Sequence, residues 1–172
     1  MKLLLTTIAA VVLVGCGPQP PDISIHEAAL AGNIEAVKQA IADGADVNAY
    51  DSFGLTPLHE AAKGQHPGPG GHTDIAELLI ANGADVNATD DFLNGRTPLS
   101  VAANYGNKET AELLIANGAN VNAKDNDGKT PLDYTTRENE LAAAVFGTGT
   151  ETADPLRKHG GKTRAELKAE DK

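Results

Sequence analysis

The chain has 172 residues, and its 24 Asp and Glu against 14 Lys and Arg give a formal net charge of −10 at pH 7. This length allows one domain or two small ones, and the acidity argues against a nucleic-acid partner, because phosphate binding needs a basic face. With one Cys, three Tyr, three Phe and no Trp, we expect neither an intramolecular disulfide nor an aromatic platform for single-stranded nucleic acid.

The chain begins with a segment typical of targeting sequences. Lys2 precedes an apolar run at residues 3–14, which is shorter than the roughly 20 residues that a membrane-spanning helix needs. The tetrapeptide 13–16 (LVGC) resembles the lipobox of bacterial lipoproteins, in which a peptidase cleaves before the cysteine and its sulfur receives a diacylglycerol. The resemblance implies a signal peptide at residues 1–15 and a lipid at Cys16; the alternatives are an ordinary secretory signal and an uncleaved anchor.

The residues after Cys16 form a Pro-rich tether at residues 16–22, and the six after the cysteine span on the order of 19 Å when extended. Gly17 occupies the position at which lipoproteins of the inner membrane often carry Asp. The resemblance therefore implies a lipid-anchored protein of the bacterial cell envelope, at the periplasmic face of the outer membrane.

Two strings recur in the middle of the chain. GADVNA, with GANVNA as its variant, begins at residues 44, 83 and 118, and TPL begins at residues 56, 97 and 130. The proline of TPL recurs after 41 and then after 33 residues, and the excess consists of six residues at 65–70 (QHPGPG) and two in the loop at 90–94. The underlying period is therefore 33 residues, which is typical of a repeat architecture.

The Thr-Pro-Leu-His opening, the paired alanines and the Gly-Ala-Asp-Val-Asn close of this period resemble the ankyrin repeat. The resemblance implies an all-α repeat solenoid of helix-turn-helix units with β-hairpin or finger loops between them. The predicted repeat domain covers residues 23–163, and a polar C-terminal tail at residues 164–172 is expected to fray, with one helical turn at residues 164–169. The four predicted units are residues 22–50, 51–89, 90–124 and 125–163.

The residue types of one unit favour this architecture. In the second unit Thr56 can cap a helix whose first residue is Pro57, where the missing N–H has no cost. The small alanines at 61 and 62 allow a neighbouring helix to approach closely. Gly83 can end the second helix in the left-handed conformation. No unit buries its apolar face alone, so four stacked units share one elongated core.

The fourth unit departs from the pattern. Residues 142–150 lengthen what we predict to be the same turn between helices that residues 65–70 lengthen in the second unit, so both insertions project from one edge. Thr135 and Thr136 replace the paired alanines. Pro155 is tolerable only in the first turn of a helix. We therefore expect an atypical closing unit.

Catalytic motifs are incomplete in this chain. The segment 160–163 (GGKT) lacks the leading glycine and the preceding strand of a phosphate loop. Asp125, Asp127 and Gly128 lack the first and last ligands of a calcium loop. The three serines lie outside any nucleophile-elbow context. We predict no enzyme activity, no catalytic residue, no metal site and no cofactor.

The histidines admit two interpretations. His26 and His59 stand where the resemblance implies a structural hydrogen bond to the neighbouring finger. His66 and His72 flank the insertion at 65–70 and can in principle bind a metal or a small molecule, which is a weak alternative because no cysteine is near.

The acidity is concentrated in the repeats. Residues 22–154 hold 21 acidic and 7 basic residues, a net charge of −14, whereas residues 155–172 carry +3. Either this charge solvates the surface or it favours a basic protein partner.

The ankyrin resemblance implies that a partner binds to the finger tips and to exposed first-helix residues along a concave groove. Five of the aromatic residues fall at variable positions of the repeat, where the core does not require them, although each can instead pack between fingers. The predicted partner-binding residues are Tyr50, Phe53, Glu60, Lys63, Phe92, Leu93, Val101, Asn104, Tyr105, Tyr134 and Arg137.

These observations together predict a non-catalytic module for protein–protein interaction, anchored by lipid to the bacterial envelope, whose partner is an unknown protein. The alternatives are a structural protein that organises envelope components through the insertion edge, and an immunity-type inhibitor of a toxin or enzyme.

Overall fold

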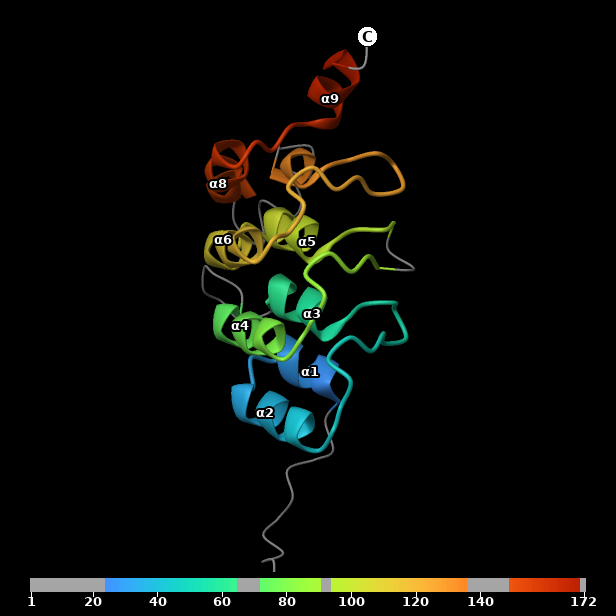
Figure 1. The fold of residues 1–172 in the computed structure, drawn as a ribbon, viewed down its shortest axis with the longest axis vertical. Coiled ribbons are helices and arrows are strands. Elements are labelled where there is room, and N and C mark those ends of the chain that lie inside the picture. The colour runs from blue at the N-terminus through green and yellow to red at the C-terminus, as the bar shows by residue number, and fades with distance from the viewer. Residues whose placement is uncertain (1–23, 65–71, 91–93, 136–148, 171–172) are drawn as a thin grey trace, which may run out of the picture.

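In a computed structural model, which describes residues 24–64, 72–90, 94–135 and 149–170, the helices form a stack of pairs along one long axis (Figure 1). The predicted signal peptide, Cys16 and the tether lie outside the described residues. The helices are α1 (Ile25–Leu30), α2 (Ile34–Ala42), α3 (Pro57–Lys63), α4 (Thr73–Ala81), α5 (Pro98–Tyr105), α6 (Lys108–Ala116), η1 (Pro131–Thr135), η3 (Gly149–Thr152), α8 (Ala153–Lys158) and α9 (Arg164–Glu170).

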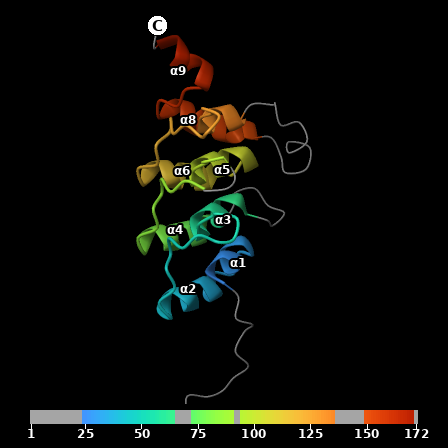
Figure 2. The same ribbon diagram turned by 90° about the vertical axis from the view of Figure 1, so that its right-hand side faces the viewer.

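The stack has two layers of helices. The first helices of the units, α1, α3 and α5, form one layer, and the second helices, α2, α4, α6 and α8, form the other (Figures 1 and 2). The alanine pairs of the first three units are completely buried between the layers. Because alanine is small, the helices approach closely while leucines such as Leu79 and Leu114 fill the remaining core. The predicted all-α solenoid is confirmed.

The loops between units project to one side of the stack (Figure 1). Within the described ranges no residue is assigned to a strand, so these fingers are turns rather than the β-hairpins that we allowed for. The first finger is closed by one backbone hydrogen bond of 2.9 Å, from the Asp51 N–H to the Leu55 carbonyl. No further ladder is needed in this turn, because the Asp51 carbonyl accepts the Gly54 N–H at 3.0 Å and the Asp51 carboxylate accepts those of Phe53 and Leu55.

The insertion at 65–70 lies where the sequence predicts it, between the two helices of the second unit, although its own residues are outside the described ranges. In the third unit the Asn107 N–H donates to the Ala102 carbonyl at 2.9 Å and closes the turn between helices. In the second unit the His72 N–H donates to the equivalent Ala61 carbonyl at 3.1 Å. The same bond therefore closes both turns despite the six extra residues.

Side chains at this turn also join successive units. In the second, third and fourth units, the N-cap residue of the second helix donates to a carbonyl at the end of the preceding unit's first helix, where carbonyls lack the regular bond to the residue four positions ahead. The donors differ in type but share one position. The bonds run from His72 Nε2 to Leu30 O at 3.1 Å, from Asn107 Nδ2 to Ala62 O at 2.7 Å and from Thr152 Oγ1 to Ala103 O at 3.4 Å.

A second row of contacts between units runs through the VNA strings. The Asn48 amide donates to the Gly83 carbonyl at 3.0 Å and accepts from the Asp85 N–H at 2.8 Å. The Asn87 amide likewise donates to the Gly118 carbonyl and accepts from the Asn120 N–H. The Asn122 amide donates to the Gly160 carbonyl and accepts from the Lys162 N–H. Each asparagine thus uses both ends of its amide to set the spacing to the next unit.

The fourth unit is atypical, as expected. Its first helix is the 3-10 helix η1, and its second helix α8 begins at Ala153, so Pro155 stands in the first turn, where the sequence requires it.

The tail is more ordered than expected, because the helical turn predicted at residues 164–169 is the helix α9 at residues 164–170. Thr163 and Glu166 form a capping box, in which the Glu166 carboxylate accepts the Thr163 N–H at 2.7 Å. Two ion pairs also connect α9 to the preceding residues, from Arg157 to Glu166 at 2.8 Å and from Lys162 to Glu170 at 2.6 Å. The Arg157 guanidinium and the Thr163 hydrogen bonds lower the pKa of Glu166 to about 2.

Candidate functional site

The first finger presents two aromatic side chains on an aspartate-centred turn. Asp51 Oδ1 accepts the N–H groups of Phe53 at 2.8 Å and Leu55 at 2.9 Å, which fixes the turn. Phe53 is 65% exposed and Tyr50 is 51% exposed, and among the described residues these are the large hydrophobic side chains with the greatest exposure. The core does not hold them, so they are available to a partner.

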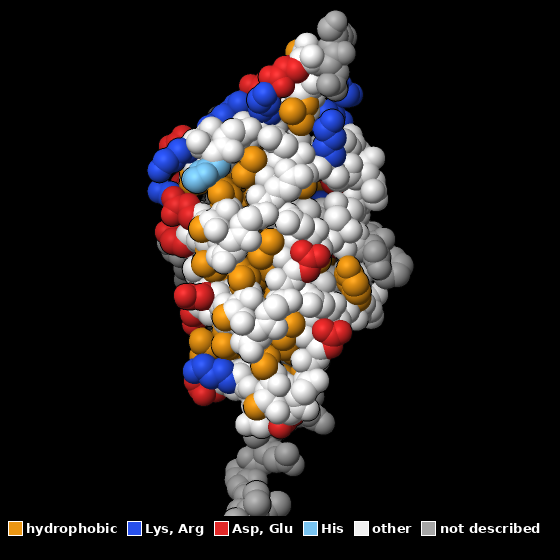
Figure 3. Space-filling view, in the orientation of Figure 1, with side chains coloured by type: hydrophobic (Ala, Val, Ile, Leu, Met, Phe, Trp, Pro, Cys, Tyr) orange, Lys and Arg blue, Asp and Glu red, His pale blue; other side chains and the backbone are white. Residues whose placement is uncertain are grey.

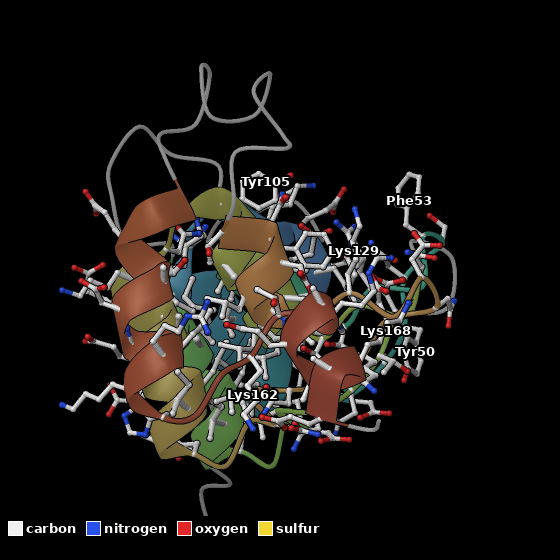
Figure 4. All side chains as sticks on the ribbon, turned by 90° about the horizontal axis from the view of Figure 1, so that it is seen from above. Tyr50, Phe53, Tyr105, Lys129, Lys162 and Lys168 are labelled. Atoms are coloured by element: carbon white, nitrogen blue, oxygen red, sulfur yellow. The ribbon has the colours of Figure 1, made fainter. Side chains whose placement is uncertain are left out.

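The two aromatics of this finger face opposite ways. In the view down the stack (Figure 4), Phe53 and Tyr105 lie toward the same side of the molecule, while Tyr50 lies toward the other. Tyr105 ends α5 and is half-buried. We call the side that carries Phe53 and Tyr105 the aromatic side. Seen down the stack, two of the predicted binding residues therefore lie toward one side of the molecule and the third lies toward the other.

Two predicted groove residues differ from expectation. We predicted Glu60 and Val101 as exposed first-helix side chains, but they are only 5% and 4% exposed. Their helices α3 and α5 each have a first helix on both sides, and the small alanines draw these neighbours close. Glu27, at the equivalent position of the first unit, is exposed. Exposure at this position is therefore a property of the end unit.

Tyr134 is held by the fold. Its hydroxyl donates to the Asp125 carboxylate, and its ring lies 5.9 Å from the Arg96 guanidinium and 5.8 Å from the Lys129 ammonium. Burial, together with the hydrogen bond to Asp125, raises the pKa of Tyr134. Its half-buried ring thus has partners inside the protein already.

The remaining predicted residues divide into two groups. Lys63 and Asn104 are half-buried at the ends of α3 and α5, and partner binding through them stays a prediction. Phe92, Leu93 and Arg137 lie outside the described residues.

The structural role predicted for two histidines is confirmed. His26 Nε2 donates to the Ala49 carbonyl at 2.8 Å, and His59 Nε2 donates to the Arg96 carbonyl at 3.0 Å in the next finger. His59 Nδ1 accepts the Thr56 N–H at 3.2 Å, so both ring nitrogens are engaged. Burial lowers the pKa of His59, which keeps it neutral and able to accept this bond.

The metal interpretation receives no support from His72, because its Nε2 donates to the Leu30 carbonyl. Across the described ranges, no group of three or more His, Cys, Asp or Glu side chains is placed to hold a metal ion. His66 lies outside those ranges.

The charged side chains are distributed unevenly. Acidic side chains are spread along the stack, and basic ones gather at its C-terminal end (Figure 3). Two of these basic groups, Arg157 and Lys162, belong to the ion pairs of α9. None of the helices in the described part of the chain has the length and apolar character needed to cross a membrane.

Comparison with known proteins agrees with the observed repeats. Residues 68–146 match a family model described as ankyrin repeats (3 copies), and residues 25–68 match one described as ankyrin repeats (many copies). Two curated relatives are named protein phosphatase 1 regulatory subunit 27, from Homo sapiens and Mus musculus, and each is 46% identical over 44 residues, or 26% of this chain. The matched stretch spans 29% of the length of each relative.

Proposed function

The chain belongs to the ankyrin repeat family, and we propose that it is a non-catalytic scaffold that binds a protein through its aromatic side and is anchored by a lipid at Cys16 to a bacterial envelope. Ankyrin repeats imply protein–protein interaction. Both curated relatives are named as regulatory subunits, which agrees with binding rather than catalysis.

The observation that carries this proposal is the exposure of Phe53 on a rigid turn. Binding energy at protein interfaces concentrates in a few aromatic and arginine side chains that become desolvated. The Asp51 carboxylate fixes the backbone at Phe53 through its N–H before binding, so less backbone entropy is lost when a partner covers the ring. Tyr105, which is half-buried, lies toward the same side of the molecule (Figure 4).

A photo-crosslinking amino acid placed at position 53 tests this proposal. In living host cells we expect the full chain to give one adduct of defined mass from position 53, and none from position 50 on the opposite side of the same finger. With the captured partner purified, Phe53→Ala is expected to weaken binding at least about tenfold, or about 1.4 kcal/mol, while Tyr50→Ala leaves it unchanged. Equal adducts from both positions, or none from position 53, would contradict the aromatic side as the binding face.

The charge of the repeats favours a basic partner. Residues 22–154 carry a net charge of −14, and acidic side chains are spread along the stack. Complementary charge raises the rate of encounter more than the final affinity. Association should therefore slow as salt rises above physiological ionic strength, with a smaller change in dissociation.

Anchoring rests on the tetrapeptide 13–16 and on Cys16 as the single cysteine of the chain. Two or three acyl chains give stable attachment, whereas one chain is marginal. We expect Cys16→Ser to abolish incorporation of labelled palmitate and to move the protein from the membrane fraction to the soluble fraction or to an uncleaved precursor. Ser24→Ala, eight residues further along, serves as the control and should keep both the label and the location. Palmitate labelling of the Cys16→Ser protein would refute the anchor.

A further inference from the structure

Three successive units carry a cation at the same position of the repeat. The threonines at 97, 130 and 163 follow one another at the 33-residue period, and the residues directly before them are Arg96, Lys129 and Lys162. In the second unit this position holds Leu55, which is buried. Because equivalent positions lie one above the other in a stack of repeats, the three cations form a line along a stack whose net charge is negative.

The three cations differ in how far the protein satisfies their charge. Lys162 pairs with Glu170 at 2.6 Å. Arg96 Nε lies 3.5 Å from Asp90 Oδ2, an ion pair without a hydrogen bond, and no described residue accepts a hydrogen bond from the guanidinium. The Lys129 ammonium forms neither an ion pair nor a hydrogen bond with any described residue. Arg96 and Lys129 therefore keep donors for an anion from outside the chain.

The ring of Tyr134 brings these two cations to one place. The ring centre lies 5.9 Å from the Arg96 guanidinium and 5.8 Å from the Lys129 ammonium, and the Tyr134 hydroxyl donates to the Asp125 carboxylate. Because the face of an aromatic ring attracts cations, Tyr134 holds two long side chains at one place before a partner binds. The rotamer entropy that they lose on binding is then smaller than for two free surface side chains.

Both cations can be reached from solvent. The Arg96 side chain is 20% exposed, and Lys129 is half-buried. Of the nitrogens of these two side chains that lack a hydrogen bond among the described residues, Arg96 Nε is buried, whereas the terminal guanidinium nitrogens and the Lys129 ammonium meet solvent. Seen down the stack, Lys129 lies between Tyr105 and Phe53 (Figure 4). An incoming group therefore meets these donors without entering the core.

From these contacts we propose that Arg96 and Lys129 bind a carboxylate of the protein partner, an aspartate or glutamate side chain, beside the Tyr134 ring. This inference rests on the proposed protein-binding function and names the chemistry of the group that is bound. A carboxylate fits because the planar guanidinium can donate to both of its oxygens, while the ammonium adds a second positive charge.

The charge of the repeats restricts the partner to a single anionic group at this site. A polyanion does not fit, since the net charge of −14 on residues 22–154 repels a run of phosphates. A partner that is basic overall and carries one carboxylate at this point satisfies both the acidic stack and the two cations.

A random peptide library displayed on phage and selected on the full chain in detergent micelles tests the inference. We expect the enriched peptides to share one acidic residue at a fixed position. For the best peptide, Lys129→Gln should weaken binding at least about tenfold, or about 1.4 kcal/mol. Exchanging the peptide's acid for its amide should weaken binding further, because both cations lose their ligand. Lys129→Gln should then add nothing, since the contact that it removes is already gone.

Lys124→Gln is the matched control. Lys124 lies five residues earlier in the same loop and is exposed, so its loss changes the net charge by the same amount. We expect peptide affinity to stay within about twofold, or roughly 0.4 kcal/mol. Lys129→Arg keeps the charge and should also keep the affinity. Unchanged far-UV circular dichroism spectra and unfolding midpoints would show that the variants fold normally.

The inference is overturned if the enriched peptides share no acidic residue, if no sequence is enriched, or if Lys129→Gln and Lys124→Gln weaken binding equally. Crosslinking at position 53 decides the proposed function separately, so a scaffold that binds its partner without Arg96 and Lys129 would be recognised as such.

Discussion

Leu79→Ala is expected to lower the free energy of unfolding by about 2–5 kcal/mol, which is the range observed when a buried leucine side chain is truncated and a cavity remains. Leu79 on α4 is completely buried, and α4 contacts α2, α3 and α6. In a repeat stack each unit is stabilised by its neighbours, so a cavity in an interior unit weakens the interfaces on both sides. Urea unfolding monitored by circular dichroism measures the loss.

Leu78→Ala provides the matched control for this experiment. Leu78 precedes Leu79 on the same helix but is only half-buried, so the same truncation removes fewer contacts while its effect on helix propensity is identical. We expect a clearly smaller loss. Equal losses for the two variants would show that α4 does not pack as described.

Asn107→Ala is expected to destabilise the protein by about 1–3 kcal/mol, because it removes the side-chain donor to one buried and one part-buried carbonyl. Asn107 Nδ2 donates to Ala62 O at 2.7 Å and to Lys63 O at 3.1 Å, at the end of the preceding unit's first helix. The second unit fills the same position with His72, so Asn107→His should restore most of the stability. Thermal or urea unfolding of the three proteins gives the comparison.

Asn33→Ala separates this contact from ordinary helix capping. Asn33 accepts the Ala36 N–H at 3.1 Å and no described unit precedes it, so its loss should cost about 1 kcal/mol, as for an exposed N-cap. The interpretation fails if Asn107→His is no more stable than Asn107→Ala.

Much of the fold can be predicted from the spacing of two short strings. The TPL and GADVNA strings give the period, and the excess residues correctly locate the insertion, because His72 and Asn107 close equivalent turns. Because proline is tolerated only in the first turn of a helix, Pro155 correctly predicts that α8 begins shortly before it. These features follow from backbone rules that depend on local sequence alone.

The contacts between units are harder to predict. Three different residue types, His72, Asn107 and Thr152, donate the same hydrogen bond to the preceding unit. This position is therefore not recognisable from a conserved residue type, and only the ability of the side chain to donate is shared. The burial of Glu60 and Val101 depends on how closely three consecutive first helices pack, which one unit's sequence does not contain. The opposite directions of Tyr50 and Phe53 follow from the turn at Asp51, and this too is a tertiary property.

The helix α9 is longer than the single turn that we predicted at residues 164–169. Thr163 and Glu166 have the spacing of a capping box, and an acidic and a basic residue on α9 each find a partner in the preceding segment. Composition alone made this segment resemble a solvated tail, because charged residues occur both in tails and in helices stabilised by ion pairs.

The closure of the helical turn has a consequence for how this protein can change. Because the hydrogen bond from residue 72 to residue 61 matches the one from residue 107 to residue 102, the turn accepts chain of different lengths without altering either helix. The entropy cost of closing a loop grows slowly with its length, so a longer inserted segment lowers the stability of the protein only slightly at this turn. The VNA loops offer no such freedom, since each asparagine amide is bonded to the next unit at both ends. Foreign sequence can therefore be added at one edge of the stack while the spacing of the units is preserved.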